Sequence, residues 1–201
     1  MTNEQYYELI RPYEDAMQLM LTKLEILNHN IYDRTSSESR PVHHMQHRVK
    51  EKKSIEEKLE RLGMTDSVIN AKDHLMDIGG IRVICYFQKE VYELVESLKR
   101  QSDLIVIKEK DYMKHPKENG YRSYHIIFGV PLHTLDAMEY YPVEVQFRTL
   151  SMDFWSSMEH RICYKKDRED KDELSKQLQA LSESLALIED ELRNYVAIEN
   201  P

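Results

Sequence analysis

The chain has 201 residues, enough for one domain with helical extensions and too few for two large domains. Its 41% hydrophobic and 32% charged residues, with five glycines and six prolines, exclude a mainly disordered, collagen-like or low-complexity protein. The formal net charge of −8 argues against a general nucleic-acid-binding protein. No apolar run is long enough to span a membrane and the first residues are polar, so we expect a soluble, cytoplasmic protein.

The acidic charge is concentrated at the two ends of the chain. Residues 1–30 hold five acidic and two basic residues, and residues 167–201 hold ten and four, which leaves a slight positive excess between them. Lysines and arginines gather in residues 48–61 and 108–122. The middle of the chain could therefore hold a small anion.

The first helix is predicted by apolar residues that recur at three- and four-residue spacings from Ile10 to Ile31. The polar stretch 35–37 should end this helix, whose apolar stripe needs a partner. His43 and His47 follow at a spacing that suits metal ligands on a helix, but we interpret this stretch as a solvated turn.

Two shorter helices are expected next. One runs through Ile55 and Leu59 and ends at Gly63, a residue suited to the left-handed position after a helix. Thr65 and Asp66 can open the other.

From residue 81 the sequence is typical of strands. Residues 81–87 and 104–108 are rich in β-branched or aromatic residues and flank an amphipathic helix, which predicts a strand–helix–strand unit. Cys85 and Cys163 lie far apart without metal-ligand or disulfide spacing, so we expect two reduced packing residues. Residues 111–120 contain proline, asparagine and glycine and should form a loop.

Two further strands are predicted, one over residues 121–130, broken by Pro131, and one over 141–148. Apolar and polar residues alternate in the second of these strands. We expect one face of it to join the core and the other to carry chemistry through Glu144 and Gln146.

The chain should end in two helices, from about 150 to 166 and from about 174 to 195. Leucine, isoleucine and tyrosine follow a heptad pattern along the last one. This seam could pack on the domain's own sheet. We favour packing in an oligomer, because the N-terminal helix offers a second unattached stripe. The fold class is α+β, a small mixed sheet with helices before and after it.

Two carboxylates could share a divalent ion. Asp77 precedes Gly79 and Gly80 just ahead of a strand, and Glu144 lies on the polar face of another. Mg²⁺ is usually held by one or two carboxylates while substrate phosphates and water fill its other positions. Spacing alone would also fit a helix cap or a solvated turn.

Basic and aromatic residues strengthen the case for a nucleotide site. Lys50 and Lys58 would lie on one side of a helix, and Tyr121 follows a glycine where its ring could stack on a base. Lys117 and His125 are suitable phosphate-binding neighbours. Neither GxxxxGK[ST] nor GxGxxG occurs, which excludes P-loop and Rossmann nucleotide binding.

Five ordered blocks resemble the synthetase domain of the RelA/SpoT family, and the flanking helices resemble its single-domain branch, the small alarmone synthetases of the RelP/RelQ kind. The blocks are Arg48-Val49-Lys50 with Ser54 and Lys58; residues 77–83; residues 110–125; residues 143–149; and Phe154-Trp155 with Glu159-His160 and Tyr164-Lys165.

The resemblance implies a nucleotidyltransferase-like mixed sheet and a pyrophosphokinase that moves the β,γ-diphosphate of ATP to the ribose 3′-hydroxyl of GDP or GTP, releasing AMP. It further implies one synthetase domain with an N-terminal helix at 1–34, a catalytic core at 41–166 and an oligomerisation helix at 167–201. A homotetramer is expected, with no membrane or stable nucleic-acid partner.

The same resemblance assigns roles to residues. It implies that Asp77 and Glu144 bind Mg²⁺ and that Glu144 takes the 3′-hydroxyl proton. It places ATP against Arg48, Lys50, Ser54, Lys58 and Arg82, and GDP or GTP against Lys110, Lys117, Asn119, Tyr121, His125 and Gln146, with Arg148 on the same face.

Two alternatives bear on function. A toxin of the same fold would pyrophosphorylate the 3′ end of tRNA, which the acidic chain ends disfavour. A catalytically idle nucleotide- or RNA-binding regulator would not need both carboxylates. Hydrolysis of the alarmone is not expected, because the His-Asp pair of the longer family members does not occur in the sequence.

Overall fold

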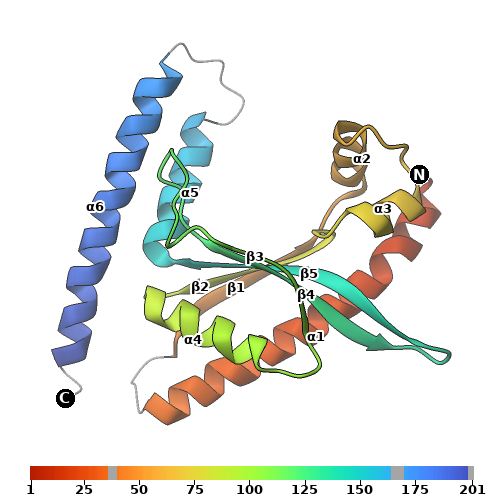
Figure 1. Cartoon of the computed structure of the whole chain (residues 1–201), viewed down its shortest axis with the longest axis horizontal. Coiled ribbons are helices and arrows are strands. Elements are labelled where there is room, and N and C mark those ends of the chain that lie inside the picture. The colour runs from red at the N-terminus through yellow and green to blue at the C-terminus, as the bar shows by residue number, and fades with distance from the viewer. Residues whose placement is uncertain (36–39, 164–169, 199–201) are drawn as a thin grey trace.

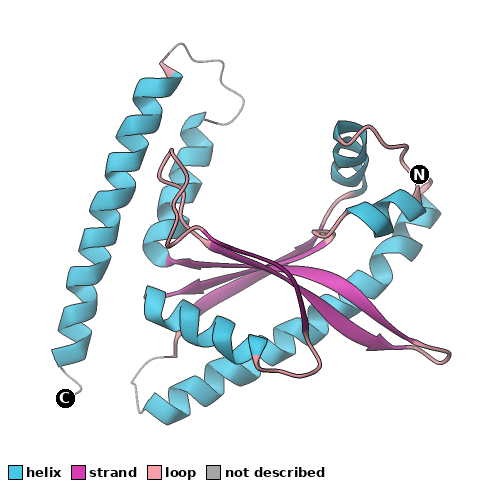
Figure 2. Ribbon diagram, viewed as in Figure 1, coloured by secondary structure: helices cyan, strands magenta, loops and turns pink. Residues whose placement is uncertain are grey.

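The structure is a computed structural model, and it describes residues 1–35, 40–163 and 170–198. A single five-stranded sheet forms its centre, in the order β1-β2-β5-β4-β3 (Figure 2). β2 and β5 are parallel, whereas the other neighbouring strands are antiparallel. The strands are β1 (Val42–Val49), β2 (Gly79–Cys85), β3 (Ile105–Asp111), β4 (Tyr124–His133) and β5 (Met138–Thr149).

Six helices surround this sheet in the described residues. α1 and α4 lie along one side of it, α2 and α3 lie near one end, and α5 and α6 stand at the other end (Figure 1). Their bounds are α1 (Asn3–Thr35), α2 (Lys52–Arg61), α3 (Val68–His74), α4 (Gln88–Lys99), α5 (Leu150–Cys163) and α6 (Lys171–Ile198). The α+β class predicted from the sequence is confirmed.

The hydrophobic core lies between the sheet and the helices α1 and α4. Val143, Val145 and Phe147 of β5 are fully buried in it, as the alternation of that strand predicts. Residues 144, 146 and 148 therefore point to the opposite face. The fully buried Cys85 is a packing residue, as expected.

The N-terminal stripe already has its partner within the chain, which corrects the interpretation that it was unattached. Tyr13, Met20 and Leu24 are at most 1% exposed and belong to the core, and α1 contacts β2, β4 and β5. Sequence periodicity defines an apolar face but does not say which surface covers it.

The stretch interpreted as a solvated turn is the edge strand β1, which pairs antiparallel with β2. His43 and His47 therefore lie on a strand and not at helical spacing. Arg48 also belongs to β1, whereas Lys58 lies on α2. The strand was missed because most of its residues are half-buried or exposed, without the apolar alternation that would mark them.

Two boundaries and one strand pairing differ from prediction. α3 begins after Ser67, whose hydroxyl accepts a hydrogen bond from the Asn70 backbone N–H, and not at Thr65. Pro131 does not break β4, because β3 reaches only to the position opposite Gly129 and leaves Pro131 with one neighbouring strand. β3 joins the edge of the sheet beside β4, so it does not pair with β2 as a simple strand–helix–strand unit would suggest.

The terminal helices also differ in detail. α5 ends at Cys163, and the rest of its expected span lies outside the described residues, as do positions 36 and 37 of the stretch expected to end the first helix. In α6, Leu178 is 4% exposed, whereas Leu181, Ile188, Leu192 and Tyr195 are more than half exposed. Most of the heptad seam therefore faces away from this chain, against the alternative of packing on its own sheet.

Replacing Met20 by alanine should test the packing of α1. Met20 is fully buried, so we expect the Met20→Ala protein to lose about 2–5 kcal/mol of unfolding free energy in urea denaturation. Leu19→Ala is the matched control, because Leu19 is 45% exposed on the same helix. Equal losses in the two variants would contradict the assignment of this stripe to the core.

Candidate active site

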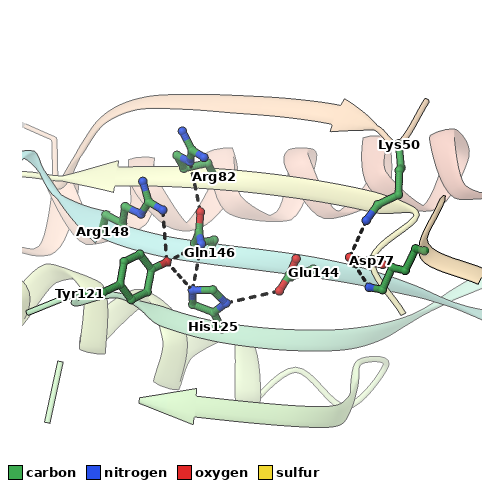
Figure 3. Close-up of polar contacts among 9 residues, drawn as sticks. Lys50, Asp77, Arg82, Tyr121, His125, Glu144, Gln146 and Arg148 are labelled. Carbon is green, nitrogen blue, oxygen red and sulfur yellow. Dashed lines mark hydrogen bonds and ion pairs between the residues drawn. The ribbon is translucent and has the colours of Figure 1, made fainter. Parts of the chain in front are cut away.

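Asp77 lies in the connection before β2, between two lysines. Lys50, just after β1, and Lys58 of α2 each donate a hydrogen bond to Asp77 Oδ2 at 2.7 Å (Figure 3). A helix and the end of an edge strand thus bring two cations to one carboxylate oxygen. The predicted proximity of Lys50 and Lys58 is confirmed, although only Lys58 is helical.

The electrostatics of Asp77 keep it ionised. Burial by itself would raise the pKa of the Asp77 carboxyl, but hydrogen bonds and charge from Lys50 and Lys58 outweigh burial and lower it. The other carboxylate oxygen, Oδ1, is buried and has no hydrogen-bond partner. A buried anionic oxygen without a donor is suited to a cation.

Glu144 points from β5 to the open side of the sheet. It pairs in register with Gly80 of β2, three residues after Asp77, and with Ile127 of β4. His125 Nδ1 lies 3.4 Å from Glu144 Oε1, and the Glu144 side chain is one-third exposed. Glu144 is thus reachable by a ligand, and Figure 3 shows it between the Asp77 cluster and His125.

Gln146 is the centre of a second polar cluster on the same face. Its side-chain amide donates to Tyr121 Oη at 2.9 Å and lies 2.9 Å from His125 Nε2, while its carbonyl oxygen accepts from Arg82 Nε at 3.2 Å. Tyr121 Oη also contacts His125 Nε2 at 2.9 Å and accepts from Arg148 Nη2 at 3.2 Å. Side chains from β2, β4, β5 and the loop before β4 therefore meet at one amide (Figure 3).

The strand register explains why these residues converge. Gln146 is paired with Arg82 on one side and with His125 on the other, and these are paired with Gln46 and Lys110 in the edge strands. Directly opposed residues on neighbouring strands share a face. One row of side chains thus crosses all five strands.

A pocket of about 210 Å³ opens on this face. Of the residues predicted to bind substrate, Arg48, Arg82, Glu144 and Gln146 line it. Gln46 and His47 of β1 also line it, and neither was predicted to bind substrate because β1 itself was missed.

The loop before β4 holds three of the predicted acceptor residues, Lys117, Asn119 and Tyr121, and Lys110 lies near the end of β3 beside it. Lys117 Nζ lies 4.9 Å from the centre of the Tyr121 ring and 5.2 Å from that of Tyr112, and Lys110 Nζ lies 5.7 Å from the latter. Asn119 Oδ1 accepts a hydrogen bond from the Tyr121 backbone N–H at 3.2 Å. The loop is thus a cationic and aromatic surface, suited to a base and phosphates.

Asp153 was not predicted, and it ties two arginines together. Arg148 Nη1 donates to Asp153 Oδ1 at 2.9 Å, and Arg82 Nη1 lies 3.7 Å from the same oxygen. Burial, followed by repulsion from Arg148, lowers the pKa of the Arg82 guanidinium. The sequence signal for Asp153 was its place one turn into the helix that follows the strand of Arg148.

The structure does not bring every predicted residue to the pocket. Ser54 is exposed in the first turn of α2 and does not line the pocket, whereas Arg48 is exposed on β1 and does line it. No group of three histidine, cysteine, aspartate or glutamate side chains forms a metal site in residues 1–35, 40–163 and 170–198. Asp77, with its unpartnered Oδ1, and Glu144 are the candidate donors on this face, since Mg²⁺ is commonly bound by one or two carboxylates and completes its coordination with substrate phosphates and water.

This surface has the parts of an enzyme that transfers phosphoryl groups between nucleotides: positioned cations, carboxylates for a metal, and flat side chains on either side. Comparison with known proteins agrees. The family model described as "Region found in RelA / SpoT proteins" matches residues 47–169, and the chain belongs to this family.

Relatives in Bacillus subtilis strain 168 cover most of the chain. It is 38% identical to GTP pyrophosphokinase YwaC over 171 residues, which cover 85% of this chain and 80% of that protein. It is 31% identical to GTP pyrophosphokinase YjbM over 192 residues, which cover 96% of this chain and 89% of that protein.

A solved structure matches this chain in fold over almost its whole length. The small alarmone synthetase 1 from Bacillus subtilis, bound to its product pppGpp, superposes with a TM-score of 0.81 at 28% identity, covering 99% of this chain and all of that one. None of the helices described here could cross a membrane.

Proposed function

We propose that this chain is a GTP pyrophosphokinase that synthesises (p)ppGpp from ATP and GDP or GTP, a Mg²⁺-dependent transferase of the small alarmone synthetase type. The observation that carries the proposal is that Asp77 with its two lysines, and Glu144, share one open sheet face with the Arg82–Gln146–Tyr121 cluster. Family membership and the pyrophosphokinases among its relatives support it.

The reaction joins the acceptor 3′-oxygen to the β-phosphorus of ATP and breaks the bond from that phosphorus to the α–β bridging oxygen, so AMP leaves. Glu144 takes the 3′-hydroxyl proton, which increases the nucleophilicity of that oxygen. A Mg²⁺ held by Asp77 and Glu144 would neutralise phosphate charge. Lys50 and Lys58 lie where they can leave Asp77 for the phosphates of ATP.

The two bases lie on opposite sides of β5 in this proposal, adenine toward β2 and guanine toward β4. Arg82 stacks on the adenine of ATP, with Arg48 beside it in the pocket and Ser54 near the phosphates. Tyr121 stacks on guanine, while Lys110, Lys117, Asn119 and His125 hold the ribose and phosphates of the acceptor. Gln146 and Arg148 fix the Tyr121 hydroxyl from behind.

A product assay tests this function. Purified protein with Mg²⁺, labelled ATP and GDP or GTP should release AMP and move label to the guanine nucleotide, whereas deacylated tRNA should acquire none. Label on tRNA would favour the toxin, and absence of AMP would favour an idle regulator. Incubation with product alone should leave it intact, because synthesis is the only activity proposed.

We also propose that the chain acts as a cytoplasmic homotetramer held in part by α6. The support is an exposed apolar face on that helix, which includes Leu181, Ile188, Leu192 and Tyr195. Exposed apolar surface of this extent on one helix is costly unless another surface covers it.

Introducing a charge on this face should break the assembly. A Leu192→Glu protein is expected to sediment as a smaller species than wild type at micromolar concentration, because the carboxylate would have to be buried in the contact. Glu191→Gln is the control on the same helix. A monomeric wild-type protein would contradict the tetramer.

A further inference from the structure

The loop that carries Tyr121 is shaped by hydrogen bonds of its own. The Gly120 N–H donates to the Lys117 carbonyl at 2.8 Å, and the Lys117 N–H donates to the Tyr121 carbonyl at 3.1 Å. This turn places Lys117, Asn119 and Tyr121 on one short segment. Movement of the turn would move three residues proposed to hold the acceptor nucleotide.

The terminal helix α6 rests directly on this turn. Ser182 Oγ donates to the Gly120 carbonyl at 2.6 Å, and Ser182 is 6% exposed. Trp155 Nε1 of α5 donates to the Leu178 carbonyl of α6 at 2.8 Å, and the Trp155 ring meets the Tyr121 ring edge-on at 6.4 Å between centres. Figure 1 shows α6 running alongside α5.

Gly120 is required for this approach. Its φ of +89° is one that other residues rarely adopt, and a Cβ there would lie 2.8 Å from Gln179 Cα and 2.9 Å from Ser182 Cβ. Both atoms belong to the body of α6, so a larger residue would displace either the turn or the helix.

A second polar anchor fixes α6 further along. The Glu189 carboxylate is 7% exposed and accepts hydrogen bonds from the Thr149 hydroxyl at 2.6 Å and from the Ser151 hydroxyl. A buried carboxylate is costly unless donors satisfy it, so these hydroxyls select one docking position. Thr149 and Ser151 flank the start of α5, beside Arg148.

From these contacts we propose that α6 is a positioning element for the acceptor nucleotide, with Ser182 as the residue that holds the Gly120 turn in register. The inference rests on the proposed function. Ser182 touches no substrate; it acts through Gly120 on Tyr121 and Lys117. In the described residues no hydrogen bond or ion pair joins the Lys50–Asp77–Lys58 cluster to α6, so the residues proposed to bind the ATP phosphates have no direct polar link to the helix.

Removing the Ser182 hydroxyl tests the proposal. We expect Ser182→Ala to raise KM for GDP about fivefold, the effect of one lost net hydrogen bond, with KM for ATP and kcat changed by less than about twofold. Gly120→Ala should raise KM for GDP further. Trp155 is the only tryptophan in the sequence, so its fluorescence can report GDP binding without turnover and should show the same weakening.

Ser184→Ala is the matched control, because the exposed Ser184 hydroxyl donates only within α6, to the Ala180 carbonyl. Failure of the wild-type protein to form (p)ppGpp would overturn the proposed function itself. If wild type is active but Ser182→Ala and Ser184→Ala have the same KM for GDP, the positioning role alone is overturned. Equal rises in both KM values, or a large fall in melting temperature with Ser182→Ala, would likewise reduce α6 to general support of the fold.

Discussion

A Glu144→Gln protein is expected to fold as wild type does. Its kcat for diphosphate transfer should fall about 100- to 1,000-fold, as when an enzyme loses one strong transition-state contact. Glutamine keeps the size of the side chain beside His125, but it cannot take a proton or supply a charged metal ligand. AMP release under saturating nucleotides measures kcat, and circular dichroism checks the fold.

Glu139→Gln provides the matched control for this variant. Glu139 lies on the same strand, but its carboxylate accepts a hydrogen bond from Tyr141 and does not line the pocket. We expect wild-type rates from it. Near-normal turnover by the Glu144→Gln protein would remove Glu144 from the chemistry.

Asp77→Asn should also lower kcat by a similar factor, because it removes a proposed metal ligand and the anion that holds Lys50 and Lys58. This variant should in addition be less stable by about 1–3 kcal/mol near neutral pH, since two partly buried cations lose their counter-charge. Asp73→Asn, exposed on α3, is the control for both effects.

The pH dependence of that stability difference has a definite sign. The pKa of Asp77 is lowered in the folded protein, so its ionised form stabilises the fold above the unfolded pKa of about 3.8. As pH falls below that value the wild type loses this stabilisation, and its unfolding free energy should approach that of Asp77→Asn. A difference that persists unchanged to pH 3 in urea denaturation would contradict the ion-pair explanation.

The polar face of β5 could be predicted from sequence because a strand period of two is a local property. Val143, Val145 and Phe147 mark the buried side, so Glu144 and Gln146 had to face the other way. That they meet Arg82 and His125 depends on strand order and register, which periodicity does not contain. Resemblance to a known family, and not spacing, named those partners.

The strand β1 and the inner face of α6 could not be predicted, each for a physical reason. β1 is an edge strand whose side chains are mostly half-buried or exposed, so its identity comes from pairing with β2. α6 buries Ser182 and Glu189 toward its own chain and exposes Leu181, Leu187, Ile188 and Leu192. A search for apolar stripes finds the exposed face of such a helix and overlooks the polar face that packs on the rest of the chain.

The pairing of β5 with β2 and β4 fixes the spacing of the proposed catalytic and binding side chains. Gln146 and Glu144 are two residues apart on one strand, and successive same-face positions are spaced by about 7 Å. An insertion or deletion of a single residue within 143–149 would turn the side chains on one side of it toward the hydrophobic interior, so the carboxylate, the amide or both would leave the polar face. Natural variation in length should therefore be confined to places such as the 134–137 hairpin, while the segment 143–149 keeps its length wherever catalysis is retained.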